Sequence, residues 1–270
     1  PERGAKVFPL LLVASGDTSR DAVSSAGNDA LKRIDTCDIL LQYEPMLVQT
    51  LFDLFLDVRA DIPLRCLVLS KGLLRASLSA SCFPEVHQVI QESVYKPGLP
   101  DRLRSLGMQY LSFVVGNGTD ASLRENGLEL LQGMLKVIRD ETDGSPSFSP
   151  IVRGFAYTAL GEIMIRVPTL LSQHAHTTPE LFFTAAQSAS EPSEVRSAAS
   201  QALSVLAPVF SVESNDSSSA IRRDSVLDVL RRTVRNGSDL ASSARLAAVL
   251  WANECFAFGD SSARMINIIC

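Results

Sequence analysis

Small and apolar side chains recur at helical spacing along the chain, and the clearest example lies between residues 193 and 210. After Arg196, such side chains stand 2, 3, 6, 7 and 10 positions further on, at Ala198, Ala199, Ala202, Leu203 and Leu206. At 3.6 residues per turn these positions share one face of a helix, and the intervening serines and glutamine share the other. The pattern therefore predicts a helix that another element covers on one side only.

The same pattern, led by an arginine, occurs six times at separations of 39 to 49 residues. We refer to the six as the repeat arginines: Arg20, Arg65, Arg104, Arg153, Arg196 and Arg245. A period of about 40–47 residues is typical of paired-helix arrays, in which one pair cannot bury its apolar face and must stack on the next. Strand-like alternation is absent from the sequence. We therefore predict an all-α fold, a HEAT-like helical-repeat solenoid of about six helix pairs plus a truncated seventh.

One array is expected to occupy the whole chain, residues 1–270. The predicted pairs lie near residues 5–34, 44–80, 83–116, 120–168, 179–210 and 220–258, with a partial repeat at 262–270. Residues 35–43 are expected to form a linker. We expect Asp17 or Thr18 to cap the second helix of the first pair, and Pro63 to lie in the first turn of the second helix of the next pair. The sequence begins at Pro1 and stops in an apolar segment, so we expect a piece of a longer protein.

Composition and charge narrow the classes of function. Hydrophobic residues make up 46% of the chain, but no apolar run is long enough to cross a membrane, so membrane insertion is not expected. The net charge of −5 comes from basic and acidic residues mixed along the sequence, which argues against a nucleic-acid partner. Five cysteines, odd in number and widely spaced, indicate free thiols in a reducing compartment, and hence a cytoplasmic or nuclear location.

Candidate chemistry is sparse. The chain has three histidines, and no serine or cysteine has a histidine and carboxylate partner at a recognisable spacing, so no enzyme activity, cofactor or small-molecule substrate is expected. His174 and His176 lack further ligands at metal-binding spacing. The repeat arginines are expected to make structural pairs or caps, in preference to a ladder that binds an acidic peptide. Ser225 follows Arg222 and Arg223 and is a candidate site for a basophilic kinase.

Several residues that a generic helical repeat does not require are shared with a known family. They include Gln109 and Tyr110 in the third predicted pair, and Tyr157, Gly161 and Pro168 in the fourth. Through them, roughly residues 5–210 resemble the amino-terminal region of the eukaryotic proteasome adapter and scaffold family, whose members are long HEAT-repeat proteins. After residue 211 only the helical pattern is shared.

The resemblance implies a non-enzymatic role. Members of that family are expected to associate with the 26S proteasome, to bridge and stabilise its particles and to link them to other partners. Two alternatives stay open on the sequence alone: a segment of an importin-β-type nuclear transport receptor, or another HEAT scaffold such as a phosphatase regulatory subunit. In each alternative the partners are proteins.

Overall fold

The computed structural model describes residues 2–34, 36–139, 148–167, 169–170, 181–182, 184–186, 188 and 190–211. Within these ranges the chain forms helices and turns and no strand, which confirms the all-α class. The chain divides into two compact units, and the boundary between them follows Ser122. The predicted pair at 220–258, the partial repeat at 262–270, Arg245 and Ser225 lie outside the described residues.

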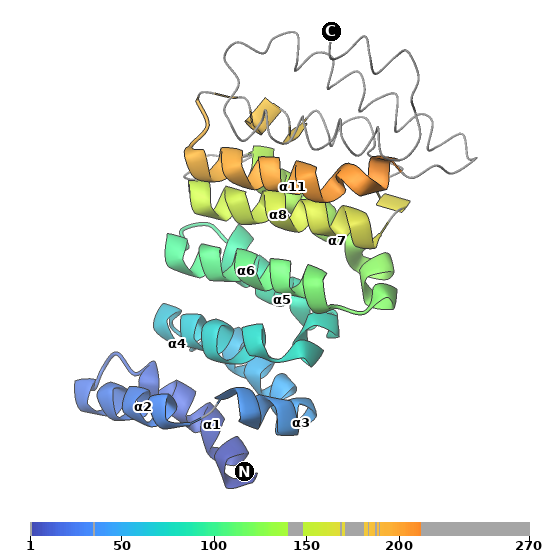
Figure 1. The fold of residues 1–270 in the computed structure, drawn as a ribbon. Helices are drawn as coiled ribbons and strands as arrows, with labels where there is room; N and C mark the ends of the chain where they lie inside the picture. Colours follow the sequence, from blue (N-terminus) through green and yellow to red (C-terminus); the bar gives the residue numbers. More distant parts are fainter. Residues whose placement is uncertain are drawn as a thin grey trace, which may run out of the picture. The chain divides into compact units, whose positions relative to one another are not determined.

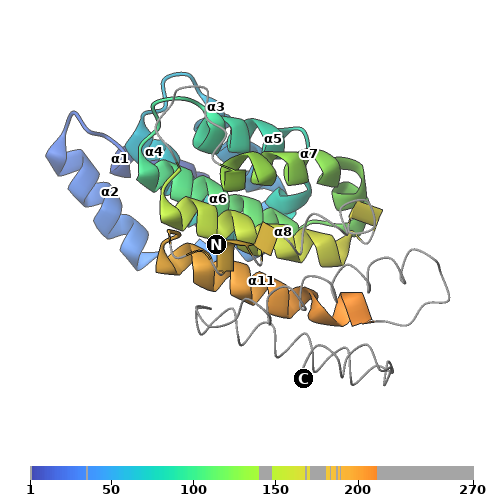
Figure 2. The same cartoon turned by 90° about the horizontal axis from the view of Figure 1, so that it is seen from above.

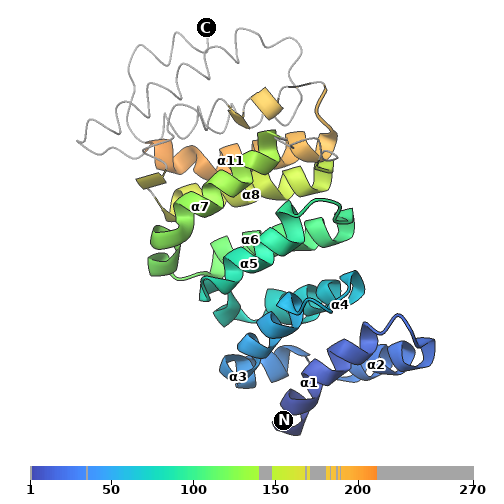
Figure 3. The same ribbon diagram turned by 180° about the vertical axis from the view of Figure 1, so that it is seen from behind.

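The first unit contains six α-helices in two layers. Helices α3 and α5 pack together, α4 and α6 pack together, and α5 also packs on α6, while α1 packs on α2 and α3 (Figures 1 and 2). Seen from behind, α5 lies in front of α6 (Figure 3). The helices are α1 (Glu2–Ser15), α2 (Asp21–Arg33), α3 (Thr36–Leu56), α4 (Ile62–Leu67), α5 (Glu85–Ile90) and α6 (Asp101–Asn117).

Short turns of other helical types continue α4 and α5. A π-helical turn and two 3-10 turns follow α4, and another π-helical turn follows α5: η1 (Val68–Gly72), η2 (Leu73–Arg75), η3 (Ser77–Ser81) and η4 (Gln91–Tyr95). The segment from η2 to η3 leads from the second predicted helix pair into the third. Aromatic side chains fill the core of this unit, and Phe8, Phe52, Phe55 and Tyr110 are fully buried.

The predicted linker at residues 35–43 is wrong, because α3 already begins at Thr36. The backbone leaves helical geometry only at Tyr43, where φ is −123° and ψ is 16°. Two residues later comes Pro45, which has no N–H and whose ring collides with the carbonyl four residues back. Two helical segments therefore meet at Tyr43, the second starting at residue 44 where the second predicted pair begins, and Ile39 in the first segment is buried.

The start of α4 agrees with the sequence, but that of α2 does not. Pro63 lies in the first turn of α4, and Asp61 caps that helix by accepting the Leu64 N–H at 3.0 Å. The predicted capping of α2 is wrong, since no side chain caps it. Asp17 instead accepts the backbone N–H and hydroxyl of Ser19, and Thr18 donates to Asp61 at 3.3 Å. Both candidate caps are thus engaged elsewhere.

The second unit begins in the first turn of α7 (Asp120–Arg139) and contains α8 (Pro150–Arg166) and α11 (Ser193–Ser211). Helices α8 and α11 run side by side (Figure 1). Small residues allow this close approach: a Cβ added to Gly161 would lie 3.0 Å from the Cβ of Ala202. Ala199, Ala202, Leu203 and Leu206 on the predicted apolar face of α11 are buried.

Candidate protein-binding surface

Four of the repeat arginines lie at the same position near the start of a helix. Each is the fourth residue of its helix: Arg65 in α4, Arg104 in α6, Arg153 in α8 and Arg196 in α11. Arg20 stands directly before α2 and is exposed. Arg65 and Arg104 are buried, whereas Arg153 and Arg196 are half-buried. The recurring sequence pattern therefore marks one position relative to the helix start.

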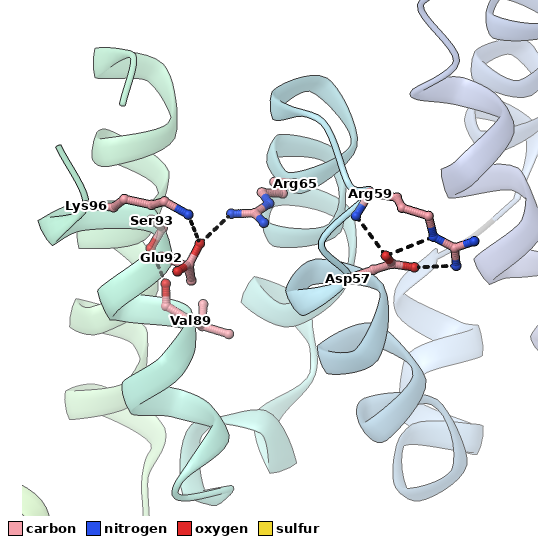
Figure 4. A network of polar contacts seen from close by, with 7 residues as sticks. All are labelled: Asp57, Arg59, Arg65, Val89, Glu92, Ser93 and Lys96. Carbon is pink, nitrogen blue, oxygen red and sulfur yellow. Dashed lines mark hydrogen bonds and ion pairs between the residues drawn. The ribbon is translucent and has the colours of Figure 1, made fainter. Parts of the chain in front are cut away.

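Arg65 belongs to a polar network between α4 and η4. Its guanidinium pairs with the Glu92 carboxylate at 3.0 Å, and Lys96 pairs with the same carboxylate at 2.8 Å (Figure 4). The Arg65 guanidinium also lies 5.5 Å from the centre of the buried Phe55 ring, which favours the cation electrostatically. One carboxylate thus joins α4 to the turn that follows α5, and both cations bind it at the same time.

Two cations hold the pKa of Glu92 below its ordinary value of 4.5. The larger cause is the hydrogen bond from Lys96, the hydrogen bond from Arg65 adds to it, and partial burial acts in the opposite direction. A carboxyl group whose pKa is lowered in the folded state stabilises the fold above its unfolded pKa. That contribution is lost as the pH falls through the folded pKa.

Replacing Lys96 with methionine is expected to raise the pKa of Glu92, because the main stabilising hydrogen bond is removed while burial stays. The stabilising effect of ionised Glu92 should therefore be lost at a higher pH than in the parent chain. NMR titration of the Glu92 side-chain carboxyl measures the shift directly. Lys136→Met, in the last turn of α7, is the matched control and should leave Glu92 unchanged. An unaltered Glu92 pKa in Lys96→Met would show that Arg65 alone sets it.

Arg153 makes a second ion pair of this kind in the other unit. Its guanidinium pairs with Glu191 at 2.9 Å, and the two side chains are only 16% and 24% exposed. Glu191 lies in the turn just before α11, so the pair joins α8 to the start of its neighbour. Nearby, burial raises the pKa of Tyr157 to about 12, and the negative charge of Glu191 adds to the shift. That phenol therefore stays neutral.

The turn between α3 and α4 is polar and exposed. Asp57 accepts the backbone N–H of Arg59 at 2.8 Å and the guanidinium at 2.9 and 3.2 Å (Figure 4). These hydrogen bonds lower the pKa of Asp57 to about 2. Val58 between them is 94% exposed. Such a local pair in solvent stabilises the turn only weakly.

An apolar groove of about 410 Å³ opens between α1 and α2. Its lining consists of Leu11, Ala14, Ala22, Val23, Ala26 and Gly27. Elsewhere along the same helix, α1 exposes Val7, Leu10 and Val13, of which Leu10 is 66% exposed. We refer to the groove and these three residues as the α1 face. Apolar side chains gathered in this way are typical of surfaces that contact another polypeptide.

The sequence matches a known protein family over nearly its whole length. The family model described as "Proteasome component ECM29, N-terminal" matches residues 2–270. The chain belongs to the ECM29 N-terminal family.

A curated relative agrees with this assignment. The human "Proteasome adapter and scaffold protein ECM29" is 25% identical over 221 residues, which cover 74% of this chain. The same alignment covers 11% of the human protein, so the chain spans about a ninth of that relative's length. This family match also disfavours the importin-β and phosphatase-scaffold alternatives.

The structure describes only some of the other candidate features of this ECM29-family chain. His174 and His176 lie outside the described residues. Where the structure is described, no three His, Cys, Asp or Glu side chains cluster as metal ligands, and no helix is long and apolar enough to cross a membrane. Cys66 and Cys82 are free thiols, and burial raises the pKa of each.

Sequence reasoning did not identify the acidic partners Glu92 and Glu191. Glu92 follows Arg65 by 27 residues, and Glu191 follows Arg153 by 38. The two acids stand at different distances from the next helix start, so no single period marks them. In both cases, however, the acid precedes the next repeat arginine, and that order along the chain was the available signal.

Proposed function

We propose that this chain is a non-catalytic, protein-binding scaffold segment of a proteasome adapter. The family match across residues 2–270 carries the proposal, and the printed name of the human relative, an adapter and scaffold, supports it. In this role the chain would help to bridge and stabilise the particles of the 26S proteasome and to link them to other proteins. Its place of action would be the cytoplasm or nucleus, with the helix pairs arranged as a HEAT-like array.

Such a role depends on an exposed protein-binding surface and does not need catalytic side chains. Stacked helix pairs bury their own apolar faces and leave long outer faces for other proteins. The α1 face combines exposed Val7, Leu10 and Val13 with a groove whose small residues, such as Ala22 and Ala26, let a polypeptide approach closely. We therefore take the α1 face as the first surface to test.

Direct binding to purified 26S proteasome tests the function. The tagged chain should retain proteasome subunits, identified by mass spectrometry, and Leu10→Asp should weaken retention by about tenfold if a central apolar contact is lost. Leu128→Asp, at an exposed leucine of α7, is the matched control and should bind as the parent does.

The outcomes separate the two parts of the proposal. Retention that Leu10→Asp leaves intact would keep the proteasome function and exclude the α1 face as its contact. Absence of proteasome subunits on the chain would overturn direct proteasome binding by this segment. Capture of a small GTPase in its GTP-bound state from a eukaryotic lysate, with no proteasome subunit, would instead favour the transport-receptor alternative.

A further inference from the structure

Serines in the η2–η3 segment, residues 73–82, contact other parts of the first unit through their side chains and backbone. Ser79 is fully buried; its hydroxyl donates to Leu73 and its carbonyl accepts the hydroxyl of buried Tyr110 at 3.1 Å. Ser81 is half-buried and accepts the backbone N–H of Thr119 at 2.9 Å. This segment therefore links the second predicted helix pair to α6 and to the turn that follows it.

Ser77 is the exposed serine of this segment, and its contacts differ from those of the other two. Its hydroxyl donates to both carboxylate oxygens of Glu44 in α3, at 3.1 and 3.2 Å. The same carboxylate accepts the backbone N–H of Leu78. The Glu44 carboxylate thus accepts from the first turn of η3 and ties the segment to α3. Hydrogen bonds to an ionised acceptor are stronger than those between neutral groups.

The sequence around Ser77 suits an arginine-directed protein kinase. Arg75 stands two residues before the hydroxyl and is exposed, and Leu78, directly after it, is 42% exposed. Ala76 has an extended backbone between the two 3-10 turns, so the hydroxyl does not lie within a regular α-helix. By contrast Ser105, which follows Arg102 and Arg104, lies inside α6 and is half-buried.

We propose that Ser77 is a phosphorylation site for an arginine-directed serine/threonine kinase, and that its phosphate displaces Glu44 from the start of η3. In the transfer, Ser77 Oγ bonds to the γ-phosphorus of a nucleoside triphosphate as the bond to the β-phosphate oxygen breaks. The nucleoside diphosphate leaves, and the hydroxyl proton passes to the base of the kinase.

Charge repulsion between the phosphate and the Glu44 carboxylate is the reason for the displacement. A phosphoserine carries a charge of about −1.5 to −2 near pH 7 and no longer has a hydroxyl proton to donate. The carboxylate that now accepts from Ser77 would face that charge at close range, so both hydrogen bonds from η3 to Glu44 are lost. The Leu78 N–H then loses its carboxylate acceptor, and the tie between α3 and the η2–η3 segment is broken.

Site mapping is the first test. The folded chain is incubated with an arginine-directed kinase and ATP, and also produced in eukaryotic cells, and phosphopeptides are mapped by mass spectrometry. We expect phosphate on Ser77, none there in Ser77→Ala, and at least about tenfold slower incorporation in Arg75→Ala, since that removes the residue the kinase selects. Absence of phosphate from Ser77 under both conditions overturns the proposal.

Hydrogen exchange tests the structural consequence. The Leu78 amide should exchange about tenfold faster in the phosphorylated chain, the factor expected for losing one hydrogen bond to a charged group. In Glu44→Gln the glutamine carries no charge, so phosphorylation should change the exchange rate much less. Equal exchange in phosphorylated and unphosphorylated chains, or an equal increase in Glu44→Gln, would overturn the displacement of Glu44.

Discussion

Replacing Phe55 with alanine is expected to destabilise the first unit by about 3–5 kcal/mol. The ring is fully buried, so its removal loses apolar burial and leaves a cavity beside α3. It also removes the aromatic face that lies 5.5 Å from the Arg65 guanidinium, which leaves a buried cation with less favourable surroundings. Both losses act in the same direction.

The measurement is the shift of the urea unfolding transition, with hydrogen exchange of α3 and α4 amides assigning it to this unit. Two controls separate the contributions. Phe55→Leu keeps most of the bulk and loses the ring, so its smaller effect estimates the aromatic contribution. Phe113→Ala, at a half-buried position in α6, should cost less than Phe55→Ala. A loss below about 1 kcal/mol in Phe55→Ala would contradict the close packing around this ring.

Adding a single methyl group at Gly107 is expected to destabilise the same unit by about 2 kcal/mol. A Cβ there would lie 2.7 Å from a Val94 methyl and 2.8 Å from the Ser93 Cβ, and it would also contact the Ser93 hydroxyl. That hydroxyl is fixed, since it donates to the Val89 carbonyl at 2.6 Å. Gly107→Ala must therefore push α6 away from η4, although alanine is the better helix former.

Gly154→Ala is the matched control for Gly107→Ala. A Cβ at Gly154 in α8 would meet its nearest neighbour, Ala198, at an ordinary 3.7 Å, so the better helix propensity of alanine should stabilise that helix by about 0.5–1 kcal/mol. In a second test, Ser93→Gly in the Gly107→Ala background should recover part of the loss by removing the clashing atoms. Similar thermal shifts for Gly107→Ala and Gly154→Ala would rule out the close contact between α6 and η4.

Periodicity predicted those helices whose apolar faces are regular over several turns. The predicted pairs at 83–116 and 120–168 end within two residues of the ends of α6 and α8, and the helix predicted between residues 193 and 210 is α11. Between η4 and α6, where the sequence is rich in proline and glycine, Gly98 adopts a φ of 73°, which favours glycine. These features depend on local spacing and on proline and glycine, which a sequence displays directly.

Features that depend on contacts between distant residues were not predictable in the same way. The kink at Tyr43 looks like a linker in sequence, because Pro45 breaks the pattern even though buried Ile39 continues the helix before it. The π-helical turns of η1 and η4 follow helices whose composition gives no sign of them. Glu92 became identifiable as a partner only once α4 and η4 lay side by side, and the α1 face only once two helices formed one groove.

The ties between neighbouring helices have a mechanical consequence. Arg65 pairs with Glu92 in η4, Glu44 accepts hydrogen bonds from η3, and Tyr110 donates to the carbonyl of Ser79. A pulling force applied to the first unit would therefore load these short polar links as well as its buried aromatic core. Such a segment would lengthen in steps as single links open, and it would recoil as each local contact reforms.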